Sequence, residues 1–286
     1  MTTVAELSNK HTVQWCPGCG DFPILIALKQ AIAATGLNPK DIVVVSGIGC
    51  SGKTPHYLNT YGLESLHGRG LAAATGVQLA NPKLKVIAVG GDGDGLGIGL
   101  GHFIHSCRRN VNITYIIFDN MVYGLTKGQT SPTSRKGFKT SSTPHGAIEH
   151  PINPVALALA ADATFVARGF SGKLEHLTNL VKEAILHKGF SFIDVLQPCI
   201  SYNHEQTYEF YNKAAYDLGA TKGWKADNVE KAFKKAYEWG EKIPIGIFFQ
   251  EKRSTYDDEL PQDKDVPVAL QPIDNVDITV MYDKYL

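Results

Sequence analysis

The chain alternates short, continuously apolar runs with stretches of helical spacing, and this alternation restricts its fold more than any other feature. Such runs are typical of strands that are buried on both faces. Each run ends in, or is followed by, Gly, Asp or Pro. The runs lie at 41–47, 85–91, 113–119, 164–169 and 191–197. Helices are expected around them at 22–35, 69–80, 96–109, 153–161 and 173–187. The order predicts an α/β fold in which helices cover both faces of a parallel sheet.

The sequence changes character after about residue 201. Residues 206–239 carry Tyr, Lys and Glu at helical spacing, and 243–250 is apolar enough for one further strand. The segment 251–286 is mostly polar and contains prolines. We therefore expect an α/β domain over residues 1–200 and a C-terminal extension over residues 201–286, because a tail of this length either wraps a partner or is loosely held.

Composition excludes several classes of function. The 286 residues include 28 Lys and Arg and 28 Asp and Glu, so the chain lacks the net positive charge of a typical nucleic-acid binder. No apolar run approaches the ~20 residues that span a membrane. The first residues, MTTVAELSNK, lack the basic and then apolar pattern of a secretory signal. We expect a cytoplasmic protein with no nucleic-acid or membrane partner.

A glycine-rich loop with two aspartates follows the run at 85–91. It reads GGDGDGLGIG and leads into an expected helix. Glycines let the backbone approach a phosphate, and a helix N-terminus favours negative charge. Asp92 or Asp94 would repel a diphosphate unless a divalent cation lay between them, and Mg²⁺ prefers such oxygen ligands. The run at 113–119 ends at Asp119, so Asn120 can supply a further oxygen from the neighbouring strand.

Four of the five cysteines form a second pattern. Cys16 and Cys19 form a C-P-G-C pair, Cys50 follows the first expected strand, and Cys199 follows the fifth. Strand ends at one edge of a parallel sheet converge, so these cysteines can supply a Cys₄ set for a [4Fe–4S] cluster or for zinc. Cys107 lies within an expected helix and is interpreted as a core residue.

The two patterns together resemble the β subunit of the 2-oxoacid:ferredoxin oxidoreductases. The matching segments, in order, are WCPGCGDF at 15–22, SGIGCSGK at 46–53, LHGRG at 66–70, GGDGD at 90–94, NMVYGLTKGQTSPTS at 120–134 and QPC at 197–199. The resemblance implies a thiamine diphosphate-binding fold. It also implies oxidative decarboxylation of a 2-oxoacid, pyruvate or 2-oxoglutarate, with coenzyme A, giving acyl-CoA and CO₂ and passing electrons through a [4Fe–4S] cluster to ferredoxin.

The resemblance further implies a role for individual residues. The cluster ligands would be Cys16, Cys19, Cys50 and Cys199. The Mg²⁺ ligands would be Asp92, Asn120 and the main-chain carbonyl of Val122. The residues around thiamine diphosphate would be Ile48, Gly49, Cys50, Ser51, His67, Gly68, Arg69, Gly70, Gly93, Asp94, Gly124 and Leu125. Lys53 and Leu125 would act in catalysis, Lys53 near the reactive carbon.

A partner subunit is also expected. In the family, a glutamate that contacts the thiamine pyrimidine comes from another subunit, and no second thiamine-type domain is evident here. The resemblance therefore implies a hetero-oligomer with an α chain or an α/γ fusion. Residues 1–200 would bind thiamine diphosphate and the cluster, and residues 201–286 would pack on this domain and on the partner.

Two alternatives remain open at this point. The segment GIGCSGKT at 47–54 matches the phosphate loop of NTPases, G-x-x-x-x-G-K-[ST]. Against this, Pro55 follows at once, residues 55–65 make a poor helix, and a phosphate loop has no use for Cys50. It also leaves the GGDGD loop and the other cysteines unexplained. The second alternative is a non-enzymatic iron–sulfur or zinc scaffold.

Overall fold

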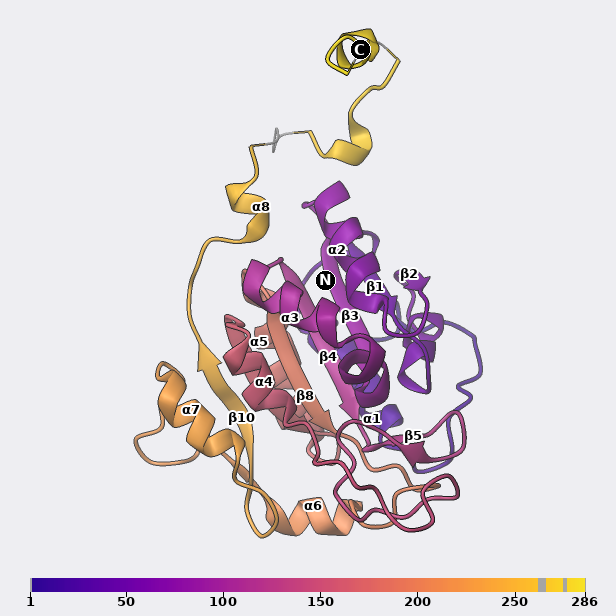
Figure 1. Cartoon of the computed structure of the whole chain (residues 1–286), viewed down its shortest axis with the longest axis vertical. Coiled ribbons are helices and arrows are strands. Elements are labelled where there is room, and N and C mark those ends of the chain that lie inside the picture. The colour runs from indigo at the N-terminus through magenta and orange to yellow at the C-terminus, as the bar shows by residue number, and fades with distance from the viewer. Residues whose placement is uncertain (1, 262–265, 275–276, 286) are drawn as a thin grey trace.

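One mostly parallel sheet forms the centre of the molecule. The computed structural model describes residues 2–261, 266–274 and 277–285. The strand order of the sheet is β2-β1-β3-β4-β8-β7-β10-β9 (Figure 1). Its strands are β1 (Ile42–Ser46), β2 (Tyr61–Glu64), β3 (Lys85–Gly91), β4 (Ile113–Asp119), β7 (Phe165–Phe170), β8 (Ser191–Leu196), β9 (Ala215–Asp217) and β10 (Ile243–Gln250). A separate hairpin pairs β5 (Val122–Tyr123) with β6 (Gln129–Thr130).

The helices cover both faces of this sheet, as the sequence predicts. On one face, α1 (Asp21–Thr35) and α5 (Leu174–Leu186) pack on strand residues such as Ile87 and Val89. The other face is covered by α2 (Gly70–Ala80), α3 (Leu100–Arg109), α4 (Pro154–Ala160) and α7 (Val229–Ala236), and there the core includes Val86, Ala88 and Cys107. The α/β fold is confirmed, and so is the assignment of Cys107 to the core.

The sheet is mostly parallel, as predicted, with one antiparallel pairing near its edge. Strand β10 pairs antiparallel with β7, and β9 pairs parallel with β10. After β8 the chain stays at the carboxyl edge, where it forms α6 (Tyr208–Ala214) (Figure 1). Strand β10 therefore begins at that edge and runs against its neighbour β7.

Two local features differ from the expectation, and a third agrees with it. The region 206–239 holds two short helices, α6 and α7, with β9 between them. Residues 55–65 form no α-helix, as expected, and are occupied by the end of a short 3₁₀ segment at Ser51–Tyr57 and by strand β2. Helix α3 begins later than expected because Asp94–Ile98 forms a π-helical turn that Gly97 interrupts with φ −84° and ψ −107°.

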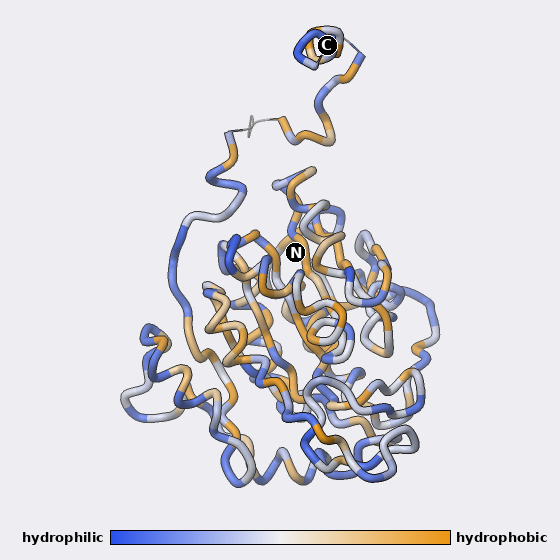
Figure 2. The backbone as a smooth tube through the Cα atoms, viewed as in Figure 1, coloured by the Kyte–Doolittle hydropathy of each residue, from blue (hydrophilic) through white to orange (hydrophobic). Residues whose placement is uncertain are grey.

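The end of the chain, after β10, leaves the body of the molecule, whereas β9 and β10 belong to the central sheet although they lie within the expected C-terminal extension. It contains α8 (Tyr256–Glu259) and α9 (Thr279–Tyr282), and it departs from the edge opposite to the carboxyl ends of the parallel strands (Figure 1). Several of its apolar side chains are exposed, among them Ile273 and Met281. Figure 2 shows hydrophobic and hydrophilic stretches in turn along this tail.

Within the described ranges, the structure contains no helix that combines the length and the apolar character needed to cross a membrane.

Two leucines of α5 provide a test of the core. Leu177 is fully buried against the sheet, whereas Leu186 at the end of the same helix is 58% exposed. We expect Leu177→Ala to lower the free energy of unfolding by about 2–5 kcal/mol, because it removes buried methyl groups and leaves a cavity. Leu186→Ala should change it by less than about 0.5 kcal/mol. Urea denaturation measures both, and equal losses would contradict the packing described here.

Candidate active site

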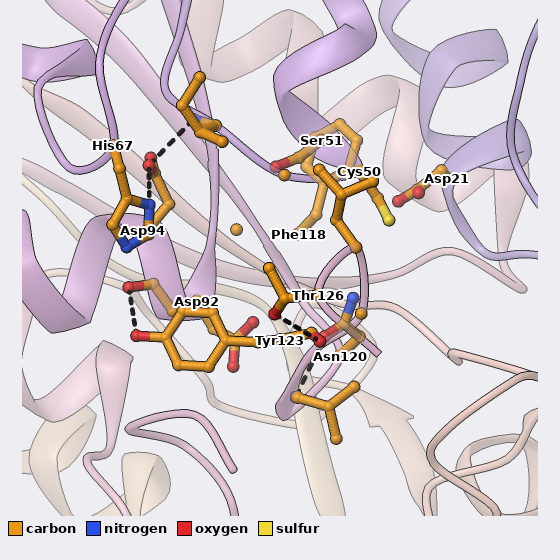
Figure 3. Close-up of a pocket in the computed structure, with 17 residues that line it drawn as sticks. Asp21, Cys50, Ser51, His67, Asp92, Asp94, Phe118, Asn120, Tyr123 and Thr126 are labelled. Atoms are coloured by element: carbon orange, nitrogen blue, oxygen red, sulfur yellow. Dashed lines mark hydrogen bonds and ion pairs between the residues drawn. The ribbon is translucent and has the colours of Figure 1, made fainter. Parts of the chain in front are cut away.

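A pocket lies at the carboxyl edge of the sheet, where parallel α/β folds bind their ligands. It encloses about 510 Å³ of space, including its open mouth. Its walls come from the loop after β1, the loop before α2, the ends of β3 and β4, and the β5 hairpin. In Figure 3, His67, Asp92, Asp94 and Tyr123 stand on one side of the pocket, and Cys50 and Asp21 stand on the other.

The pocket brings together most of the residues that the sequence singled out. Those in its lining are Ile48, Gly49, Cys50, Ser51, His67, Asp92, Gly93, Asp94, Asn120, Val122, Gly124 and Leu125. Outside the lining lie Cys16, Cys19, Lys53, Gly68, Arg69, Gly70 and Cys199. Lys53 is half-buried on the 3₁₀ segment after Cys50, and Gly68 contacts Asp94 through its backbone.

Asp94 ties two loops of the pocket together. Its Oδ1 accepts hydrogen bonds from the backbone N–H of Ile48 at 3.0 Å and of Gly68 at 2.7 Å, and it lies 3.1 Å from Nδ1 of His67. Burial raises the pKa of Asp94, and these two N–H groups oppose the shift. A Cβ atom at Gly47 would lie 1.9 Å from the carboxylate, so only glycine lets the chain pass so closely. One carboxylate oxygen of Asp94 is thus engaged in holding the loops.

The buried hydroxyl group of Thr133 holds the side chain of Asp92 in place. The Oγ1 atom of Thr133 lies 2.6 Å from Oδ2 of Asp92 and 2.8 Å from Oδ1 of Asp119. All three side chains are at most 3% exposed. Burial raises the pKa of Asp92 to about 6, although hydrogen bonds from Ser131 and Thr133 oppose the shift. The sequence analysis missed Thr133 because the bridge joins residues that are distant in the chain, although Thr133 lies in the matching segment 120–134.

A tight backbone turn presents Asn120 and Val122 to the same pocket. Met121 between them adopts φ 60°, a left-handed conformation that is uncommon for residues other than glycine. The side-chain Oδ1 of Asn120 accepts from the backbone N–H of Val122 at 3.1 Å, and its backbone carbonyl accepts from Nδ2 of Asn203 at 3.0 Å. These contacts fix the turn beside the Gly-Asp loop.

Tyr123 is a second residue that the sequence analysis missed. Its hydroxyl donates to the carbonyl of Gly93 at 3.0 Å. A Cβ atom at Gly93 would lie 2.2 Å from Cε1 of the ring. The glycine therefore admits the aromatic ring onto the loop that carries Asp92 and Asp94. Only the structure reveals this requirement, because the ring arrives from the β5 hairpin.

Two of the candidate cysteines meet at Gly124. A Cβ atom built there would lie 3.6 Å from Sγ of Cys50 and 3.9 Å from Sγ of Cys199. Burial raises the pKa of Cys50 to about 12, and the charges of Asp21, Cys199 and Cys16 add to the shift.

Cys19 is also in this group. Its Sγ lies 3.4 Å from Oδ2 of Asp21, which lines the pocket. Burial and the charge of Asp21 raise the pKa of the Cys19 thiol, and the charge of Cys199 adds a smaller contribution. Across the part of the chain that the structure describes, no three His, Cys, Asp or Glu side chains gather closely enough to bind a single metal ion.

Comparison with known proteins places this arrangement in a family. Residues 27–195 match the thiamine pyrophosphate enzyme C-terminal TPP-binding domain, and residues 199–265 match the C-terminal region of the pyruvate ferredoxin oxidoreductase beta subunit. The chain is 50% identical over 289 residues to the beta subunit of 2-oxoacid:ferredoxin oxidoreductase 1 from Aeropyrum pernix, covering 96% of this chain and 91% of the relative. The chain belongs to the 2-oxoacid:ferredoxin oxidoreductase beta-subunit family.

Other members of this family show a similar degree of likeness. A 2-oxoacid:ferredoxin oxidoreductase subunit beta from Saccharolobus solfataricus is 51% identical over 260 residues, covering 87% of this chain and 85% of the relative. The solved 2-oxoglutarate:ferredoxin oxidoreductase from Magnetococcus marinus superposes with a TM-score of 0.87 at 38% identity, over 90% of this chain and 87% of that one. That structure holds 2-oxoglutarate, coenzyme A and succinyl-CoA.

Family membership decides between the interpretations of the sequence. The chain is the beta subunit of a multi-subunit, thiamine diphosphate-dependent 2-oxoacid:ferredoxin oxidoreductase. The resemblance seen in the sequence is confirmed. The NTPase alternative is wrong, and the segment after Lys53 is a 3₁₀ turn with Pro55 inside it rather than the α-helix that follows a phosphate loop. The scaffold alternative is also wrong.

The clamp formed by Asp94 can be tested through stability. Asp94→Ala removes the acceptor of the buried Gly68 N–H, and we expect a loss of about 1–3 kcal/mol in the free energy of unfolding. Asp94→Asn keeps an oxygen acceptor and should lose less. Asp227→Ala, at an exposed position, serves as the control. Denaturation of the cofactor-free protein measures all three, and an Asp94→Ala protein as stable as the Asp227→Ala control would refute the clamp.

Proposed function

We propose that this subunit binds thiamine diphosphate and, with its partner, oxidatively decarboxylates pyruvate or 2-oxoglutarate in the presence of coenzyme A. The products would be acyl-CoA and CO₂, and the electrons would pass through a [4Fe–4S] cluster to ferredoxin. The observation that carries the proposal is a single pocket in which the Gly-Asp loop and the Asn120 turn face a wall that contains Cys50. The arrangement supports the proposal because the oxygen groups expected to hold a cation and a cysteine sulfur line the same pocket.

Asp92, Asn120 and the main-chain carbonyl of Val122 would hold Mg²⁺ against the diphosphate. Their fit to the cation is supported by the burial of Asp92, whose raised pKa indicates a carboxylate that lacks a positive partner. Carboxylate, amide and carbonyl oxygens are ligands that Mg²⁺ prefers. Ile48, Gly49, Ser51, His67, Gly68, Arg69, Gly70, Gly93, Asp94 and Gly124 would surround the cofactor. Thiamine diphosphate, when bound, supplies the nucleophilic carbon and the electron sink for decarboxylation.

Cys16, Cys19, Cys50 and Cys199 would hold the [4Fe–4S] cluster. The meeting of Cys50 and Cys199 at Gly124 supports this set. Burial raises the pKa of the Cys199 thiol, but backbone N–H groups of Ser201, Tyr202 and Asn203 oppose the shift and so favour the thiolate. A four-iron cluster gives each cysteine its own iron, so its thiolates stand further apart than the ligands of one zinc ion.

Lys53 and Leu125 would act on the substrate. Burial raises the pKa of Cys50, and the charge of Lys53 opposes this shift, which indicates that the ammonium group is near this wall of the pocket. A cation there would attract the carboxylate of a 2-oxoacid. Leu125 lines the pocket and is 47% exposed, so it would limit the access of water to the reacting atoms.

The partner would be an α chain or an α/γ fusion that supplies the glutamate for the thiamine pyrimidine. The tail after β10 supports an assembly role, because the neighbouring side chains of Val280, Met281 and Tyr282 are all exposed and exposed apolar groups that gather in one place mark interaction sites. The extension over residues 201–286 would pack on the domain over residues 1–200 and on this partner.

Cofactor analysis and a single activity measurement test the function. We expect the anaerobically purified complex to contain about four iron atoms for each copy of this chain, together with magnesium and thiamine diphosphate. It should reduce ferredoxin when a 2-oxoacid and coenzyme A are added. The isolated chain should not, because the pyrimidine site is incomplete. Full activity from the isolated chain, or zinc in place of iron, would contradict the proposal.

A pair of isosteric variants decides which aspartate binds the cation. Asp92→Asn removes a negative ligand of the cation. We expect the Mg²⁺-dependent retention of thiamine diphosphate to weaken by about 10–100-fold or more, because changes around a bound metal typically have effects of this size. Equilibrium dialysis measures the retention. Asp94→Asn should weaken retention less. If Asp94→Asn caused the larger loss, the assignment of the cation to Asp92 would be wrong.

A further inference from the structure

Gln197 has no role in the proposed chemistry, yet its side chain contacts a candidate cluster ligand. It lies between the end of β8 and Cys199 and is 1% exposed. Its Nε2 lies 3.1 Å from Sγ of Cys19 and 3.1 Å from the carbonyl oxygen of Pro198. A buried amide therefore connects the C-P-G-C loop with the segment that carries the fourth cysteine.

The carbonyl of Pro198 fixes which end of the amide faces the sulfur. A carbonyl oxygen only accepts hydrogen bonds, so the atom beside it must be the amide nitrogen and not the amide oxygen. The same nitrogen contacts Sγ of Cys19. An amide NH₂ group carries two hydrogens, which is enough for both acceptors. The geometry therefore directs an N–H group at the Cys19 sulfur.

The surrounding backbone holds Gln197 in this position. Its own N–H donates to the carbonyl of Asp119 at 2.9 Å, and the N–H of Gly20 donates to the carbonyl of Pro198 at 3.1 Å. A Cβ atom at Gly20 would lie 2.8 Å from Cγ of Gln197, so a glycine is needed for this close approach. These contacts hold Gln197 between the end of β4 and the C-P-G-C loop that carries Cys19.

A hydrogen bond to a cluster thiolate changes the energy of reduction. Reduction adds negative charge, part of which lies on the cysteine sulfurs, so a donor at the sulfur stabilises the reduced form more than the oxidised form. Hydrogen bonds to the sulfurs are among the factors that set the potential of an iron–sulfur cluster. A donor in a buried site has a larger effect than one in water, because the local dielectric is low.

We propose that Gln197 donates a hydrogen bond to the Cys19 thiolate of the bound cluster and thereby raises the reduction potential of that cluster. This inference rests on the proposed assignment of Cys19 as a cluster ligand. Gln197 is a positioning and tuning residue rather than a catalytic one, because its contact is with a ligand and not with the substrate.

The test compares two glutamine-to-methionine variants of the whole complex. Gln197→Met keeps an unbranched side chain of similar size but removes the N–H donor. Gln78→Met is the matched control, since Gln78 is also fully buried but its Nε2 donates to Oδ2 of Asp257 at 3.2 Å rather than to a cysteine. A redox titration with dithionite, followed by electron paramagnetic resonance, measures the midpoint potential. We expect a more negative midpoint for Gln197→Met and an unchanged one for Gln78→Met.

A second readout detects the hydrogen bond itself. In the reduced wild-type complex, electron–nuclear double resonance should detect, in addition to the backbone N–H protons that face Cys199, a further proton close to the cluster that exchanges in D₂O. This additional signal should be absent in Gln197→Met and retained in Gln78→Met. An unchanged midpoint together with an unchanged proton signal would overturn the inference. Loss of the cluster from both Gln197→Met and Gln197→Glu would also overturn it, because a tuning contact is not needed for four thiolates to hold iron.

These outcomes are distinct from a failure of the proposed function. If the wild-type complex contains no four-iron cluster, the ligand assignment itself is wrong. If the wild-type complex contains the cluster and Gln197→Met leaves both readouts unchanged, only the role of Gln197 is wrong.

Discussion

The convergence of parallel strands at one edge of the sheet is the constraint on which the whole candidate site depends. Strands β1, β3, β4 and β8 end side by side, and the residues that follow them come from four distant parts of the chain. Cys50 follows β1, Asp92 follows β3, Asn120 follows β4 and Cys199 follows β8. No local motif could bring Cys50, Asp92 and Asn120 into the lining of one pocket in this way. The fold does so because every crossover returns the chain to the same edge.

This edge also concentrates buried negative charge. Asp92 and Asp119 share the hydroxyl of Thr133, and Asp194 lies on the neighbouring strand, where its Oδ2 accepts from Nε of Arg168 at 2.9 Å. Burial raises the pKa values of all three carboxyl groups, because a charged carboxylate loses hydration that one guanidinium cannot replace for the whole group. A divalent cation beside Asp92 would offset the excess. The oxygen ligands around Asp92 and the buried carboxyl groups beside them therefore both favour a divalent cation at this position.

The sequence predicts the strands and the candidate ligands of this site, but it does not predict the tertiary contacts that hold them in place. Buried parallel strands such as Ile113–Asp119 are recognisable because they are continuously apolar, and Asp92, Asn120 and the cysteines are recognisable because they follow such strands. The direction of β10 was not predictable, since it depends on where the chain lies after β8. The bridge through Thr133, the ring of Tyr123 on Gly93 and the contact from Gln197 to Cys19 were missed for a related reason. Each joins residues that are brought together only by tertiary packing, and none leaves a periodic signal.

The most direct measurement is a crystal structure of the anaerobic complex with data collected at the iron absorption edge. We expect anomalous scattering from a compact group of iron atoms bound by Cys16, Cys19, Cys50 and Cys199, with a cation between Asp92 and Asn120 in the adjoining pocket. Iron bound elsewhere, or a thiamine diphosphate whose diphosphate faces away from Asp92, would contradict it.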